Sequence, residues 1–124
     1  MNQIELLERQ SRLWHIDHAV SMILEFVHER SIEDYESNDL MRSAVERQLI
    51  TVGEALRRAV EVDPVIAAHI SDTPQIISCR NFLVHNYPQI DSQEIWRIIT
   101  TDLPLLLTEV RALLASADTG QNPA

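Results

Sequence analysis

Apolar residues recur every three or four positions through three long segments of this chain, a spacing that places side chains on one face of an α-helix. The segments span about residues 12–30, 39–63 and 92–113. Hydrophobic residues make up 45% of the chain, which has only 2 glycines and 5 prolines, so long regular elements are favoured over turn-rich β architecture. A shorter helix is predicted over residues 74–85. The sequence therefore predicts an all-α fold, an antiparallel bundle of four main helices plus short helices.

Caps and helix breakers predict the boundaries of this bundle. Ser31 can begin a short helix with an acidic first turn, and Pro104 should kink or interrupt the last long helix. Residues 1–10 are compatible with either a frayed lead-in or an extra helical turn. At 124 residues the chain fits a single domain, predicted over residues 1–115. The small and polar residues 116–124 are predicted to form a disordered C-terminal tail.

Gly53 lies inside the second long segment, where a glycine costs a helix on the order of 1 kcal/mol relative to alanine. The close approach of another helix would explain it. The neighbouring Glu54 can pair with Arg57, with Arg58 or with an arginine of a functional site. A solvated glutamate is the alternative.

The chain is strongly acidic, with 10 basic and 19 acidic residues, a net charge of −9 and no lysine. This charge argues against a broad nucleic-acid-binding surface, because affinity for a polyanion comes largely from basic side chains that neutralise phosphates. Activity on RNA would need the arginines to be focused in one place. Residues available for such a patch are Arg42, Arg47, Arg57 and Arg58.

The single cysteine, Cys79, excludes an intramolecular disulfide and fits a reducing compartment. Its neighbour Arg80 could lower the pKa of the thiol, but a small buried residue is the favoured interpretation. No apolar run is long enough for a signal peptide or a membrane span, so a cytoplasmic protein is expected.

Three histidines on the first long segment raise the question of a metal. His15 and His18 are three residues apart and could share an ion, and His28 follows further along. Structural zinc needs about four ligands, and no cysteine cluster supplies the others. Surface histidines are therefore the favoured interpretation, and no metal or cofactor is predicted.

The most reactive side chains lie together at the end of the short helix predicted over residues 74–85. Asn81 and His85 are four apart and share a helix face, Arg80 flanks it, and Tyr87-Pro88 should end the helix just beyond. An arginine fork can clamp a phosphoryl group and histidine titrates near neutral pH, so this set suits chemistry on a phosphate. The alternative is that these side chains cap helix carbonyls and pair with acidic neighbours.

Arg80-Asn81, three apolar residues, His85, one residue and Tyr87 resemble the arginine-x4-histidine-x-tyrosine signature of HepT-like toxins in the HEPN superfamily. The resemblance covers about residues 12–115 and implies a helical, HEPN-like bundle.

Two further blocks support the resemblance. Residues 44–47 with 50–55 resemble the second main helix of the family, and residues 91–107 resemble its closing helix. One departure concerns packing, because the family often has a tryptophan after the proline that opens the signature helix. This chain has Pro74-Gln75 there, so a large aromatic side chain is missing.

The resemblance implies a metal-independent endoribonuclease toxin that acts as a homodimer, with the signature helices of both copies meeting near the two-fold axis. His85 would be the general base or acid, Arg80 would stabilise charge on the phosphoryl oxygens, and Asn81 would orient His85 or the phosphate. The RNA would supply its own 2′-hydroxyl as nucleophile, which gives cyclic phosphate ends.

The resemblance also implies a partner, an MntA-like minimal nucleotidyltransferase antitoxin in a type VII-like toxin–antitoxin pair. Such a partner silences the toxin by adding AMP to the signature tyrosine, which is Tyr87 by position. Without the resemblance, Tyr87 would be read as a half-buried aromatic that closes the helix end. The rival function is a non-catalytic helical companion that binds substrate for a nucleotidyltransferase, which suits the acidic charge better.

Overall fold

The computed structural model describes residues 1–85 and 91–118, with side chains up to residue 116. All elements in these ranges are helical. In chain order they are α1 (Gln3–Phe26), α2 (Ile32–Ser37), α3 (Asp39–Val62), α4 (Ile66–His69), α5 (Thr73–Val84), α6 (Ser92–Arg97), the π-helical segment η1 (Ile98–Asp102) and α7 (Leu103–Asp118). The predicted all-α bundle is confirmed.

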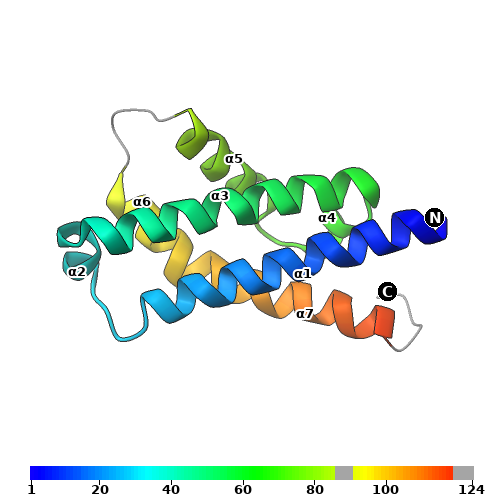
Figure 1. Cartoon of the computed structure of the whole chain (residues 1–124), viewed down its shortest axis with the longest axis horizontal. Helices are drawn as coiled ribbons and strands as arrows, with labels where there is room; N and C mark the ends of the chain where they lie inside the picture. The colour runs from blue at the N-terminus through cyan, green and yellow to red at the C-terminus, as the bar shows by residue number, and fades with distance from the viewer. Residues whose placement is uncertain (86–90, 119–124) are drawn as a thin grey trace.

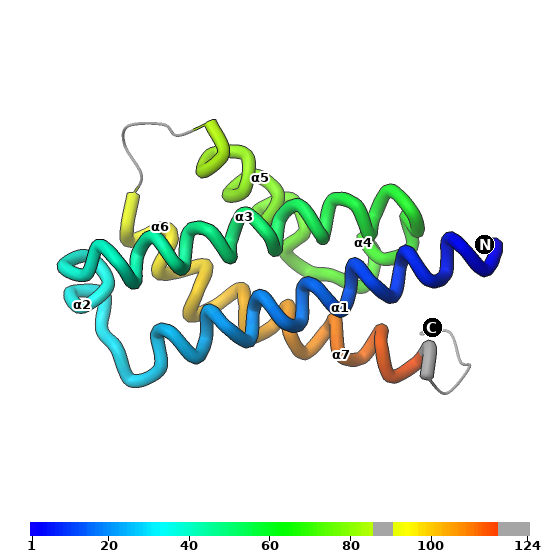
Figure 2. The backbone as a smooth tube through the Cα atoms, in the orientation of Figure 1, coloured from blue at the N-terminus to red at the C-terminus, as the bar shows by residue number. Residues whose placement is uncertain are grey.

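The two longest helices, α1 and α3, run antiparallel and side by side through the whole molecule (Figure 1). The closing helix α7 packs against α1, and α5 packs chiefly against α3. As a result α3 lies between α1 and α5, and α5 occupies an outer edge of the bundle, as the chain trace in Figure 2 shows. The helix that carries the signature is therefore a peripheral element, supported mainly from one side.

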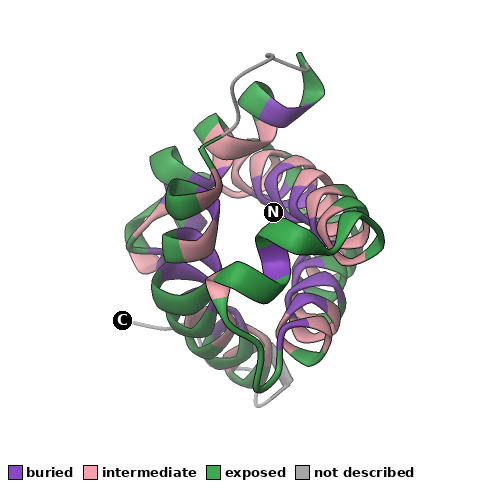
Figure 3. Ribbon diagram, turned by 90° about the vertical axis from the view of Figure 1, so that its left-hand side faces the viewer, coloured by how far each residue is buried: buried purple, intermediate pink, exposed green. Residues whose placement is uncertain are grey.

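The buried residues lie on the sides of the helices that face the inside of the bundle (Figure 3). Most of the apolar positions that repeat along the three long helices are among them. Those that are buried are Leu13, Ile16, Val20, Ile23, Val27, Val45, Leu49, Val52, Leu56, Ala59, Ile95, Ile99, Leu103, Leu106, Val110 and Leu113. Burial of this one face on each helix is the main stabilising contribution to the fold.

The first helix, α1, begins at Gln3, before its first buried residue, Arg9. Asn2 caps α1, its side-chain oxygen accepting a hydrogen bond of 2.8 Å from the backbone N–H of Glu5. Arg9 is buried, and its Nε donates to Asp63 Oδ2 at 2.9 Å, which ties this end of α1 to the end of α3. The lead-in is therefore helical. At the other end α1 stops at Phe26, short of the predicted residue 30, and Glu29 takes a left-handed backbone with φ 58°.

The predicted interruption near Pro104 is present as the π-helical segment η1. Proline has no N–H to donate and its ring crowds the preceding turn, so a regular ladder cannot continue through it. Here Leu103 N–H donates to Ile98 O, five residues back, and the chain then resumes an α-helix. This helix runs to Asp118, so residues 116–118 of the predicted tail are helical, and residues 119–124 lie outside the described ranges.

Candidate active site

The signature helix α5 begins at Thr73 with Pro74 in its first turn and ends at Val84. His85 is its C-terminal cap, and the backbone N–H of His85 donates to Asn81 O at 3.1 Å. The turn that carries His85 is thus the last one, as predicted. Tyr87 and Pro88 lie outside the described residues.

Gly53 of α3 is where α5 makes its closest approach. A methyl group on Gly53 would overlap Arg80 Cβ, would lie 2.7 Å from Arg80 Cγ, and would lie 3.3 Å from the backbone oxygen of Ile76. Glycine is therefore required by the proximity of α5, which confirms the explanation expected from the sequence. The same contact places the Arg80 Cβ and Cγ atoms directly against α3.

Arg80 is held by two neighbours. Its Nη2 lies 2.9 Å from Glu54 Oε2, and its Nη1 donates to Asn81 Oδ1 at 2.8 Å. The Arg80 side chain is 23% exposed, so the guanidinium is partly withdrawn from solvent but remains reachable. The Asn81 side chain, which was predicted to orient His85 or the phosphate, thus contacts Arg80 and helps to orient its guanidinium.

Glu54 holds three arginines. In addition to Arg80, it accepts hydrogen bonds from Arg57 Nη2 at 2.9 Å and from Arg58 Nε at 3.1 Å. The hydrogen bond from Arg57 is the largest cause that lowers the pKa of Glu54, followed by the one from Arg58, while partial burial opposes the shift. One carboxylate is thus surrounded by three guanidinium groups, which focuses positive charge on this part of an acidic chain.

This arrangement predicts a pH-dependent contribution to stability. A carboxyl group whose pKa is lower in the folded than in the unfolded chain stabilises the fold above its unfolded pKa, and this stabilisation disappears as the pH falls. At neutral pH we expect Glu54→Gln to lower the free energy of unfolding by up to about 1 kcal/mol, the range for exposed ion pairs. Well below pH 4.5, the ordinary pKa of glutamate, the two proteins should become equally stable.

Denaturant unfolding at several pH values measures this difference. Glu25→Gln is the matched control, because Glu25 is exposed on α1 and takes part in no ion pair within the described residues. A Glu54→Gln difference that is as large at pH 3 as at pH 7 would contradict the ion-pair interpretation.

His85 is exposed and lies one helical turn beyond Arg80 and Asn81, at the end of α5. The structure therefore brings Arg80, Asn81 and Glu54 into contact, and places His85 one turn further along the helix. An exposed histidine next to a partly exposed arginine leaves both side chains accessible to a phosphate group approaching the end of α5.

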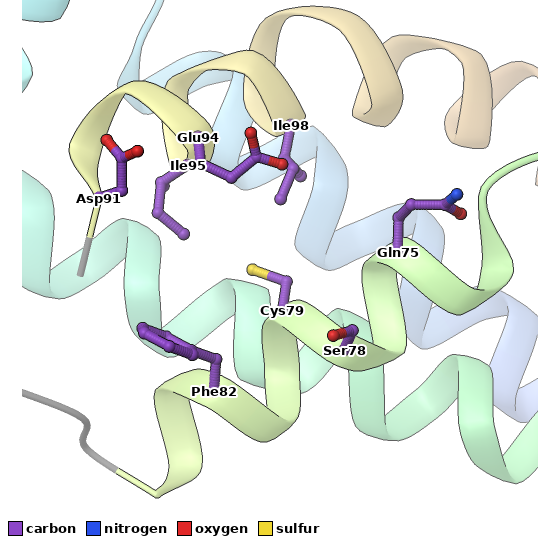
Figure 4. A pocket seen from close by; sticks show the side chains of 8 residues that line it. All are labelled: Gln75, Ser78, Cys79, Phe82, Asp91, Glu94, Ile95 and Ile98. Carbon is purple, nitrogen blue, oxygen red and sulfur yellow. The ribbon is translucent and has the colours of Figure 1, made fainter. Parts of the chain in front are cut away.

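The opposite face of α5 lines a pocket of about 390 Å³ together with α6 and the start of η1 (Figure 4). Gln75 lies at this pocket, at the position where the family often has a tryptophan, so the missing aromatic coincides with unfilled space. Cys79 points into the pocket, between Gln75 and Phe82. Burial is the largest cause that raises the pKa of Cys79, and the nearby charge of Glu94 adds to it, giving a pKa of about 11.

Cys79 is half-buried, where the sequence favoured a buried residue, and its raised pKa should make it unreactive in the folded protein. The thiolate is the nucleophile, and a thiol with a pKa of about 11 supplies on the order of a hundredfold less of it at pH 8 than an ordinary cysteine. We expect alkylation by iodoacetamide to be slower by about that factor than for the same chain in urea. Equal rates in the folded and unfolded protein would contradict the assignment.

The three histidines of the first segment do not converge. His15 lines a groove between α1 and α3, His18 lines a different one beside α7, and His28 Nε2 lies 3.5 Å from Glu29 Oε1. Within residues 1–85 and 91–118, no three histidine, cysteine, aspartate or glutamate side chains are grouped in a way that could hold a metal ion.

Two features of the site go beyond the predictions from the sequence. Glu54 holds three arginines at once, and Arg12 and His15 of α1 line a groove together with Arg47 of α3. The spacing of Glu54 to Arg57 and Arg58 carries the first signal, since residues three and four apart on a helix are neighbours. The second depends on the packing of two helices.

None of the described helices combines the length and the apolar character needed to cross a membrane.

Comparison with known proteins gives one family. The family described as "Ribonuclease HepT-like" matches residues 16–113. A Methanocaldococcus jannaschii protein named "Putative RNase MJ1380" is 28% identical over 100 residues, which cover 79% of this chain and 89% of that protein. Another protein of that organism, named "Gamma-glutamylcyclotransferase and putative RNase MJ0434", is 22% identical over 108 residues, which cover 87% of this chain and 48% of that protein. No solved structure matches significantly.

The family match spans most of the chain and includes α3, α5 and the closing helix. The names of the family and of both relatives support a ribonuclease activity, and the first of these relatives is covered almost end to end. Because the match extends over far more than half of the residues, the chain belongs to the HepT-like ribonuclease family.

Proposed function

We propose that this protein is an RNA-cleaving toxin whose active site is formed by Arg80, Asn81 and His85. The observation that carries the proposal is the anchoring of Arg80 by Gly53, Glu54 and Asn81 at an accessible edge of the bundle, one turn before His85. An arginine fixed in this way can bind a phosphate without first having to be ordered.

The proposed reaction is an internal transfer on RNA. The 2′-oxygen forms a bond to the adjacent phosphorus while the bond from phosphorus to the 5′-oxygen breaks, giving a 2′,3′-cyclic phosphate and a 5′-hydroxyl end. His85 takes the proton from the 2′-hydroxyl or gives one to the leaving 5′-oxygen. Arg80 stabilises the charge that develops on the phosphoryl oxygens, and Asn81 positions Arg80. The nucleophile belongs to the substrate, so we propose no metal step.

We propose that the active form is a homodimer in which two α5 helices meet. Apolar side chains exposed on α5 support this, since Phe82 and Val84 are 36% and 44% exposed and would lose that exposure in an interface. A two-fold axis near α5 would place Arg80 and His85 of both copies at one cleft. Two such sets would double the positive charge offered to RNA in a chain of net charge −9.

The proposed regulation is the addition of AMP to Tyr87 by an MntA-like nucleotidyltransferase antitoxin in a type VII-like pair. Tyr87 follows His85 by two residues and lies outside the described ranges, so the support is its place in the signature. A phosphate attached there would present negative charge to Arg80 and His85 and would compete with RNA for the same cations.

Growth of cells that express this protein without any partner tests the toxin proposal. We expect wild type to arrest growth with cleaved RNA, and Arg80→Ala and His85→Ala at equal soluble levels to do neither. Equal growth of all three with intact RNA would favour the rival, a non-catalytic companion of a nucleotidyltransferase, which the acidic charge suits.

A further inference from the structure

We infer that the groove between α1 and α3 is a second phosphate-binding subsite, which holds the RNA strand next to the phosphate bound by Arg80. This inference rests on the proposed function for its substrate. The groove has a volume of about 270 Å³. Arg12 and His15 reach it from α1, and Arg47, Thr51 and Glu54 reach it from α3, the two helices that lie side by side in Figure 1.

Arg47 is the strongest reason to expect an anion here. Eight of the ten arginines have a carboxylate oxygen within 4.0 Å in the described part of the chain. The other two are Arg30, in the turn between α1 and α2, and Arg47. The chain has nearly twice as many acids as bases. Arg47 is exposed beside the groove and has no carboxylate oxygen within 4.0 Å among the described residues, so its charge is not compensated there. A phosphate oxygen would compensate it.

The other groups around the groove leave its charge positive. Arg12 is paired with Glu8 Oε1 at 3.2 Å, so its own charge is already compensated. Glu54 is the one acid among the lining residues, and it is already surrounded by Arg57, Arg58 and Arg80. His15 adds a ring nitrogen that can donate to phosphate. The Thr51 hydroxyl donates to the Arg47 backbone oxygen at 3.3 Å.

The position of the groove next to Arg80 favours RNA over an acidic protein segment as its ligand. Glu54 lines the groove and also lies 2.9 Å from Arg80 Nη2, so one side chain separates the two cationic sites. A single strand that presents one phosphate to Arg80 therefore has a route to Arg47 across the half-buried α3 residues that line the groove. Strands bound in positively charged grooves are held in this way, by successive phosphates and with little dependence on base sequence.

The test is the salt dependence of binding to a single-stranded oligonucleotide of about ten nucleotides, methylated at every 2′-oxygen so that it has no nucleophile. For single strands, each phosphate contact contributes about 0.7 to the slope of log K against log salt concentration. We expect Arg47→Gln to reduce the slope by about 0.7 and to lower affinity several-fold at low salt. Arg47→Lys should keep most of the slope, because it retains the charge.

Arg30→Gln is the matched control, since it removes the same charge from an exposed arginine outside the groove. If Arg30→Gln and Arg47→Gln reduced the salt slope and the affinity equally, the effect would be one of net charge only, and the subsite would be overturned. A loss of binding to a poly-glutamate peptide, with oligonucleotide binding unchanged, would assign the groove to an acidic protein and also overturn it. Failure of wild type to cleave unmethylated RNA would instead count against the proposed function, whichever way Arg47→Gln behaves in binding.

Discussion

His85→Ala should reduce RNA cleavage by a factor of about 10² to 10⁴, the contribution of a general acid or base, while the fold stays intact. His85 caps α5 through its backbone N–H, which alanine retains, and its side chain is exposed, so little packing is lost. Single-turnover cleavage of a defined RNA measures the effect on the chemical step without a contribution from product release.

His28→Ala is the matched control for this substitution. His28 is also an exposed histidine just after the end of a helix, and its side chain is 76% exposed near Glu29. We expect this variant to cleave RNA like wild type. Cleavage by folded His85→Ala at the wild-type rate would remove His85 from the mechanism, and an equal loss in both variants would indicate an indirect effect.

Gly53→Ala should disturb both stability and activity, because the new methyl group would occupy the space of Arg80 Cβ and Cγ. These atoms are close to the α5 backbone and cannot swing away as a side-chain tip could, so α5 itself must shift. Overpacking of this kind costs about 1–3 kcal/mol, and the better helix propensity of alanine offsets about 1 kcal/mol of it. We expect a net loss of up to about 2 kcal/mol in the free energy of unfolding.

Gly53→Ala should also lower the rate of RNA cleavage, and by more than the loss of folded protein would explain. A misplacement of about 1 Å in a catalytic group can lower a rate by a factor on the order of 10². Arg80 is positioned by this contact, so its distance from the bound phosphate would change with the shift of α5. Cleavage measured well below the unfolding transition separates the two effects.

Two controls make this prediction specific to the contact between α3 and α5. Ser43→Ala adds a good helix former on the exposed face of the same helix and should leave stability unchanged or slightly raised. Arg80→Gly removes the overlapping atoms, so Gly53→Ala should cost less in that background than in wild type. The same cost in both backgrounds would show that the overlap with Arg80 is not its source.

Much of the fold could be predicted because the buried positions repeat within single helices. Leu13, Leu49 and Leu106 belong to stripes visible in the sequence, and all three are buried. Special roles for Gly53 and Pro104 could also be predicted, because a glycine inside a long helix and a proline inside an apolar pattern each break a local rule. The structure gives both a physical reason, a close helix contact and a π-helical turn.

The parts that could not be predicted depend on pairs far apart in the chain. The start of α1 carries exposed apolar residues, and its order depends on the Asn2 cap and on the contact of Arg9 with Asp63. The groove that joins His15 to Arg47 has the same origin, because no spacing within one helix shows which face of α1 meets α3. Local patterns thus identified the candidate catalytic residues, and only the packing showed how Arg80 is held.

The chemical ends of the cleaved RNA test the central claim most directly. Purified wild type and His85→Ala would be incubated with a defined RNA in the presence of a metal chelator, and the new ends analysed. We expect wild type alone to produce 2′,3′-cyclic phosphate and 5′-hydroxyl ends. New 5′-phosphate ends, or cyclic phosphate ends produced equally by His85→Ala, would contradict cleavage by 2′-hydroxyl attack at a site formed by Arg80 and His85.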